Sequence, residues 1–223
     1  YSSGLSIDFK SSNHTDDLVS LLNQVSFSTA LTLDFSKLDA PGLKETFESL
    51  KRFTALANLT LIFTRCYQID QNWIETLLDL LTQLPSSVSF LKLKFVECIQ
   101  MSPQEIHFVA CSIGKLRRLK NLIGFGLAFE DTVQFTDENA IDFGKELKQQ
   151  QLGTLKYLDL SFKGCYMLRD QGVLSLLENV KDLSCLQEAK VTFEECWEIG
   201  QSTIDKYQIG PKKISVNFQN CQK

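Results

Sequence analysis

The segment Leu155–Val173, LKYLDLSFKGCYMLRDQGV, contains the pattern that decides the fold. Apolar side chains alternate with polar ones at Leu158, Leu160 and Phe162, which is the period of a strand that buries one face. Beyond Val173 the period changes, and apolar residues recur at offsets of 0, 3, 4, 7 and 10 positions. One buried face of a strand followed by one buried face of a helix is therefore the predicted unit.

The strand pattern occurs eight times along the 223 residues, each copy ending in Phe. Half of the 16 Phe residues of the chain occupy this single position, and successive copies are about 30 residues apart. The copies span residues 5–9, 31–35, 59–63, 91–95, 125–129, 158–162, 189–193 and 214–218. The helical spacing recurs between them, with the same offsets over 74–84 and 106–116 and a shorter version over 18–25.

Strands that are joined by helical crossovers must run parallel, and units with one apolar face each must stack to bury it. We therefore expect one α/β solenoid domain of about eight repeats over residues 1–223, with a curved parallel sheet on the concave side and helices on the convex side. Ser102 and Glu105, with Pro103 between them, form the signature of a helix start. The terminal strands lie close to the ends of the sequence, which favours a place within a larger assembly.

The unit over residues 155–173 resembles the leucine-rich repeat family, in particular its ribonuclease-inhibitor-like and cysteine-containing members. The unit that begins at Leu56 matches it without a gap through Leu84. The strand with an extra inward Phe, together with the glutamines at 149–151, is also similar to the repeats of ciliate proteins. The resemblance implies a protein-binding solenoid, and it also extends to regulators of GTPases and of ribonucleases.

Five of the seven cysteines occupy one register position, three residues after the Phe: Cys66, Cys98, Cys165, Cys196 and Cys221. The resemblance implies a buried ladder at the turn out of each strand, with metal ligation or redox chemistry as the alternative. There is no C-x-x-C pair and no His at ligand spacing, so we expect no metal. Cys111 and Cys185 are expected to be buried filler. An odd number of cysteines that follows the repeat favours a reducing, intracellular location, cytoplasmic before an organelle or a cytoskeletal assembly.

Composition and the histidine count argue against catalysis. The net charge of −4 is the wrong sign for a general nucleic-acid binder, and no apolar run is long enough to span a membrane. The two histidines, His14 and His107, lack a partner that the sequence reveals, and the acidic pairs 16–17 and 194–195 are expected to be solvated loop charges. Gly124-Phe125-Gly126 falls on a repeat strand rather than on a nucleotide-binding loop. We expect no enzyme, no cofactor and no small-molecule substrate.

The non-Leu positions of each strand should point outward on the concave face. The first such column includes Ser6, Thr32, Lys92, Asp159 and Lys190, and the next includes Asp8, Asp34, Ile62, Lys94 and Ala128. The predicted partner-binding patch mixes apolar and charged residues at the centre of this face: Ile62, Phe90, Lys92, Lys94, Val96, Ala128, Glu130 and Asp159. The alternative is that Ile62 and Val96 are ordinary strand residues covered by neighbours.

The function that these patterns predict is a non-enzymatic protein–protein interaction module, a structural or adaptor subunit of an intracellular complex. Two other classes stay open at this point. One is a regulator of an enzyme, of the GTPase-activating or inhibitor type. The other is the substrate-recognition part of a ubiquitin ligase adaptor. No nucleic-acid partner and no transmembrane segment are expected.

Overall fold

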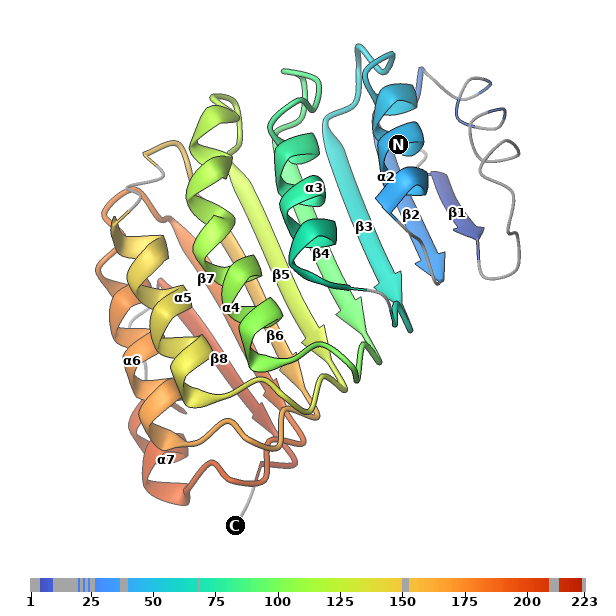
Figure 1. Ribbon diagram of the computed structural model, residues 1–223. Helices are drawn as coiled ribbons and strands as arrows, with labels where there is room; N and C mark the ends of the chain where they lie inside the picture. Colours follow the sequence, from blue (N-terminus) through green and yellow to red (C-terminus); the bar gives the residue numbers. More distant parts are fainter. Residues whose placement is uncertain are drawn as a thin grey trace.

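The computed structural model describes residues 5–9, 20, 22, 24, 27–36, 40–67, 69–149, 153–208 and 213–221. In this part of the chain eight strands form one parallel sheet, in the order of the sequence (Figure 1). The register places Phe beside Phe from β1 to β8, so the eight sequence copies occupy equivalent positions. The strands are β1 (Leu5–Phe9), β2 (Ala30–Ser36), β3 (Asn58–Thr64), β4 (Phe90–Val96), β5 (Gly124–Glu130), β6 (Tyr157–Lys163), β7 (Glu188–Glu194) and β8 (Ile214–Gln219).

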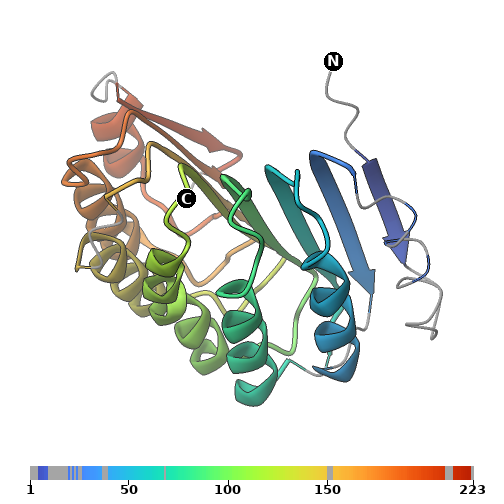
Figure 2. The same cartoon turned by 90° about the horizontal axis from the view of Figure 1, so that it is seen from above.

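The helices cover one face of this sheet and leave the other face open. Figure 2 shows them following the curve of the sheet on its outer side. They are α2 (Ala40–Leu50), α3 (Gln71–Leu81), α4 (Pro103–Cys111), α5 (Asp137–Gln149), α6 (Asp170–Lys181) and α7 (Gln201–Gln208). The predicted α/β leucine-rich-repeat solenoid is confirmed. Of the helix expected over 18–25, the structure describes residues 20, 22 and 24, and all three are helical. None of the described helices is long and apolar enough to cross a lipid bilayer.

The fourth helix illustrates how local sequence sets the limits of an element. The backbone N–H of Ser102 donates to Glu105 at 2.6 Å, so the predicted helix start is correct. The helical spacing predicts a regular helix as far as Leu116, but α4 ends at Cys111 and a 3₁₀ helix, η1 (Ser112–Arg118), follows. Ser112 and Gly114 are poor α-helix formers, which favours the tighter turn.

A stack of phenylalanine rings forms the spine of the core. Phe63 and Phe95 lie 5.4 Å apart between ring centroids, and Phe95 and Phe129 are separated by the same distance. Phe135 inserts its ring between Phe129 and Phe162, at 5.1 and 4.8 Å. The stack continues to Phe193 and Phe218, so each repeat from β2 to β8 is joined to the next through an aromatic contact.

The cysteines form the buried ladder that the family resemblance implies. The thiol of Cys98 donates to the carbonyl of Phe63 at 3.3 Å, and Cys196 donates to Phe162 at 3.4 Å. A hydrogen bond with the neighbouring Cys165 thiol and burial raise the pKa of Cys196 to about 12. The pKa of Cys98 is also raised, by its hydrogen bond with Cys66 and by burial. These thiols are therefore neutral at physiological pH. They act as small buried side chains that donate hydrogen bonds to the backbone of the neighbouring repeat.

Cys185 departs from the prediction because it is exposed, in the connection between α6 and β7. Alkylation requires a thiolate that reagent can reach, so native protein should be modified at Cys185 at least a hundredfold faster than at Cys98 or Cys196. Peptide mapping by mass spectrometry after brief treatment with N-ethylmaleimide measures this ratio. Denatured protein, in which these thiols react at similar rates, is the control. Equal rates in the native protein would contradict a buried ladder.

Candidate interaction surface on the concave face

The centre of the open sheet face is shaped by two glycines of β5. Gly124 and Gly126 stand where neighbouring strands carry Phe90 and Lys92. A Cβ on Gly124 would collide with the ring of Phe90, and one on Gly126 would lie 2.8 Å from Cγ of Lys92. The missing side chains therefore let groups on β4 lie flat across β5 and reach β6.

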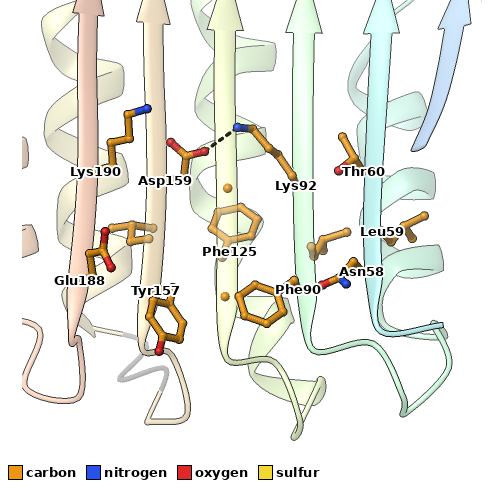
Figure 3. Close-up of a pocket in the computed structure, with 14 residues that line it drawn as sticks. Asn58, Leu59, Thr60, Phe90, Lys92, Phe125, Tyr157, Asp159, Glu188 and Lys190 are labelled. Carbon is orange, nitrogen blue, oxygen red and sulfur yellow. Dashed lines mark hydrogen bonds and ion pairs between the residues drawn. The ribbon is translucent and has the colours of Figure 1, made fainter. Parts of the chain in front are cut away.

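Two contacts span β5 in this way. The ring of Phe90 stacks on Tyr157 with 5.9 Å between centroids and 29° between planes. One step along the strands, Nζ of Lys92 donates to Oδ2 of Asp159 at 2.5 Å (Figure 3). Phe90 and Tyr157 remain 37% and 38% exposed, so their outer surfaces are open to a ligand.

These contacts border a groove of about 450 Å³ that crosses β3 to β7 near their N-terminal ends. Figure 3 shows the aromatic rings and the ion pair arranged along it. Its lining consists of Asn58, Leu59, Thr60, Phe90, Leu91, Lys92, Gly124, Phe125, Gly126, Tyr157, Leu158, Asp159, Glu188 and Lys190. Glu188, Lys190 and the Tyr157 hydroxyl have no hydrogen-bond or ion-pair partner within the described residues, so a ligand can engage them.

Further along the strands, the charged side chains of the concave face pair with one another. Nζ of Lys94 lies 2.8 Å from Oε1 of Glu130, and both side chains are about three-quarters buried. Ala128, which is paired in register with Lys94, has no exposed surface, so its expected exposure is wrong. A methyl side chain between two longer neighbours is covered by them. Ile62 and Val96 are half-buried.

Other concave charges are paired in the same manner. Lys163 on β6 donates to Glu194 on β7 at 3.0 Å, and this bond raises the pKa of the lysine. Glu194 therefore lies in a strand and in an ion pair, and its assignment as a loop charge is wrong. Thr64 donates to Asp34 at 2.8 Å. The side chains of Asp8 and Lys10 are outside the described part of the chain. A face whose charges are already paired keeps its polar groups in fixed positions.

The histidine that the structure describes has a partner that the sequence does not reveal. Nδ1 of His107 on α4 lies 3.1 Å from Oδ2 of Asp142 on α5, and Lys145 approaches the same carboxylate at 3.4 Å. This cluster lies among the helices, on the side of the sheet opposite the groove (Figure 1). Among the described residues no group of three or more His, Cys, Asp or Glu side chains could hold a metal ion. His14 and the acidic pair at 16–17 are outside the described part.

The structure brings together three residues of the predicted patch in the groove: Phe90, Lys92 and Asp159. The other five residues of that patch do not line the groove: Ile62, Lys94, Val96, Ala128 and Glu130. The prediction missed Tyr157, Gly124 and Glu188 because it considered the position ahead of the first Leu in only one repeat, at Phe90. Reading that column across the repeats, Asn58, Phe90, Gly124, Tyr157 and Glu188, would have found them.

The chain is a leucine-rich-repeat-like solenoid by its architecture: parallel strands in chain order line the concave side and helices line the convex side. No family model matches the sequence, and no curated protein matches it. Among solved structures, the C-terminal domain of tropomodulin from Caenorhabditis elegans is similar, with a TM-score of 0.44 and 10% identity. That similarity covers 77% of this chain and 93% of the tropomodulin chain.

Proposed function

We propose that this chain is a non-enzymatic protein–protein interaction module whose concave groove binds a protein partner. The observation that carries the proposal is the aromatic pair Phe90–Tyr157, which lies exposed at the centre of an otherwise polar sheet face. Exposed aromatic rings next to groups available for hydrogen bonding are the usual centre of a protein interface. Because the sheet behind them is rigid, binding requires little rearrangement.

The finer parts of the proposal rest on the repeat pattern and on the thiols. We infer one leucine-rich-repeat domain over residues 1–223, of the ribonuclease-inhibitor-like, cysteine-containing type and similar to ciliate repeats, because the same strand motif recurs throughout. The six described cysteines are free, which suits a reducing intracellular compartment. We infer a structural or adaptor role in a larger assembly because the concave groove exposes aromatic side chains that a partner protein can cover. No nucleic acid or small-molecule substrate is part of this proposal.

Affinity purification from native cells, followed by quantitative mass spectrometry, tests the groove. The double variant Phe90→Ser/Tyr157→Ser removes both rings and should reduce recovery of stoichiometric partners at least tenfold, because interface centres carry most of the binding energy. Both rings are partly exposed, so the fold should be retained. Phe27→Ser is the matched control, since Phe27 is 77% exposed and does not line the groove. Unchanged recovery in the double variant would reject the groove as the binding site.

A further inference from the structure

A second row of apolar side chains runs along the edge where strands lead into helices. We call it the rim row. It consists of the residue directly after the ladder position in the five repeats from β3 to β7, together with Met167: Tyr67, Ile99, Val133, Tyr166, Trp197 and Met167. Backbone hydrogen bonds between neighbouring repeats continue past the ends of the strands and keep the strand-to-helix connections aligned. For example, Glu97 donates to the Glu130 carbonyl at 2.8 Å and Gly164 to that of Glu194 at 2.9 Å. The connections that carry the row leave the strands at their arrowheads, along one edge of the sheet (Figure 1).

The rim row is unusually exposed for side chains of this kind. Of the seven large apolar side chains exposed in the described part of the chain, four belong to it: Tyr67, Ile99, Met167 and Trp197. Trp197 is the most exposed of these, at 54%. Its ring lies 4.9 Å from that of Tyr166, so the two form a continuous aromatic surface. A contiguous apolar patch on a soluble protein is typical of a contact surface.

The edge that carries the rim row is acidic. The five strand-to-helix connections from β3 to α7, with the last strand residue and the first helical turn, span 64–73, 96–105, 130–139, 163–172 and 194–203. They contain eleven Asp or Glu and three Lys or Arg. The helix-to-strand connections on the opposite edge, taken likewise over 48–58, 79–90, 109–124, 147–157 and 179–188, contain four acidic and nine basic residues. Although the net charge of the chain is only −4, its acidic and basic residues are therefore concentrated on opposite edges of the sheet. The acidic edge holds the N-terminal ends of the helices, where the helix dipole favours negative charge.

Part of this acidic charge is not held in a direct ion pair. Glu97 is paired with Arg65 at 2.7 Å and Glu194 with Lys163 at 3.0 Å, but Asp131, Glu138 and Glu195 have no ion pair within the described residues. Glu195 precedes Trp197 by two positions, and the Asp131 carboxylate lies against Gly164, two positions before Tyr166. The charge of Lys163 acts on both Asp131 and Glu195, but neither carboxylate is held in a direct ion pair, and the two flank the exposed aromatic pair.

We propose that the rim row is a docking surface for a basic segment of another protein. Arg or Lys side chains of that segment stack on Tyr166 and Trp197 and pair with Asp131 and Glu195. A cation over an indole ring is favourable, and the planar guanidinium of arginine also matches a carboxylate in two-point contact. The same negative field repels nucleic acid and acidic peptides. This surface is on the edge of the solenoid rather than on the concave face, so it is independent of the groove.

A capped nonapeptide of alternating Arg and Leu serves as the probe. Binding is followed by the fluorescence of Trp197, since the other tryptophan, Trp73, is buried. We expect saturable binding that weakens as salt rises. Asp131→Asn/Glu195→Gln should weaken it at least tenfold, and both replacements suit the turn conformation that these residues adopt. The control is Glu178→Gln on α6, which also replaces an exposed carboxylate by a carboxamide but lies away from this edge. It should change the affinity less than twofold.

Three results would overturn the proposal. The first is that Asp131→Asn/Glu195→Gln, the edge variant, binds the probe as tightly as the Glu178→Gln control does. The second is that a nonapeptide of alternating Glu and Leu binds as tightly as the probe. The third is that the probe causes no change in Trp197 fluorescence. Sedimentation of the unliganded protein gives a further outcome: a dimer that the edge variant dissociates would identify a second copy as the occupant and reject a basic segment. Phe90→Ser/Tyr157→Ser should keep full affinity for the probe, so failure here and failure of the groove proposal are distinguishable.

Discussion

Replacing Phe95 by alanine is expected to lower the free energy of unfolding by about 4 kcal/mol. The ring has no exposed surface, and it stacks at 5.4 Å on Phe63 on one side and on Phe129 on the other. Alanine would leave a cavity in the middle of the aromatic spine, where the flanking strands hold the backbone and cannot close it. Urea unfolding followed by circular dichroism measures the change.

Phe218 supplies the matched comparison at the end of the spine. It contacts one ring of the stack, Phe193, at 5.2 Å, and it is only partly buried. Phe218→Ala should therefore cost about half as much as Phe95→Ala. Phe95→Leu, which retains most of the apolar volume, should cost about 1 kcal/mol. A cost below 1 kcal/mol for Phe95→Ala would show that the rings do not form a continuous core.

The fold could be predicted from the sequence because two local periods were sufficient to define it. Alternation every second residue specifies which face of a strand is buried, and the offsets after Val173 and Ile74 specify one face of a helix. The common position of Phe in eight copies then fixed the register, which the structure confirms from β1 to β8. The end of α4 at Cys111 escaped prediction because the apolar spacing continues into a 3₁₀ helix.

The candidate site was only partly predictable because it depends on side chains that are missing from β5, between the strands that carry the contacting residues. Gly124 and Gly126 were recognised as strand residues, but their significance is the space that they leave for Phe90 and Lys92. The ion pairs of Lys92 and Lys94 join residues that are far apart in the sequence, and only the register brings them together. The same holds for His107 and Asp142, whose helices are adjacent in space.

Gly124→Val should weaken recognition at the groove at least tenfold while leaving the fold intact. The new side chain would occupy the space of the Phe90 ring and displace that ring from Tyr157. Valine favours strands, so the free energy of unfolding should change by no more than about 1 kcal/mol. Thr192→Val is the matched control, because it adds no bulk and lies on β7 outside the groove lining.

Isothermal titration of the partner recovered with the wild-type chain tests the central claim most directly, since Gly124→Val changes the groove alone. The expected result is an affinity at least tenfold weaker for Gly124→Val and unchanged for Thr192→Val. Equal affinities for the wild type and Gly124→Val, with both proteins folded, would contradict binding in the concave groove.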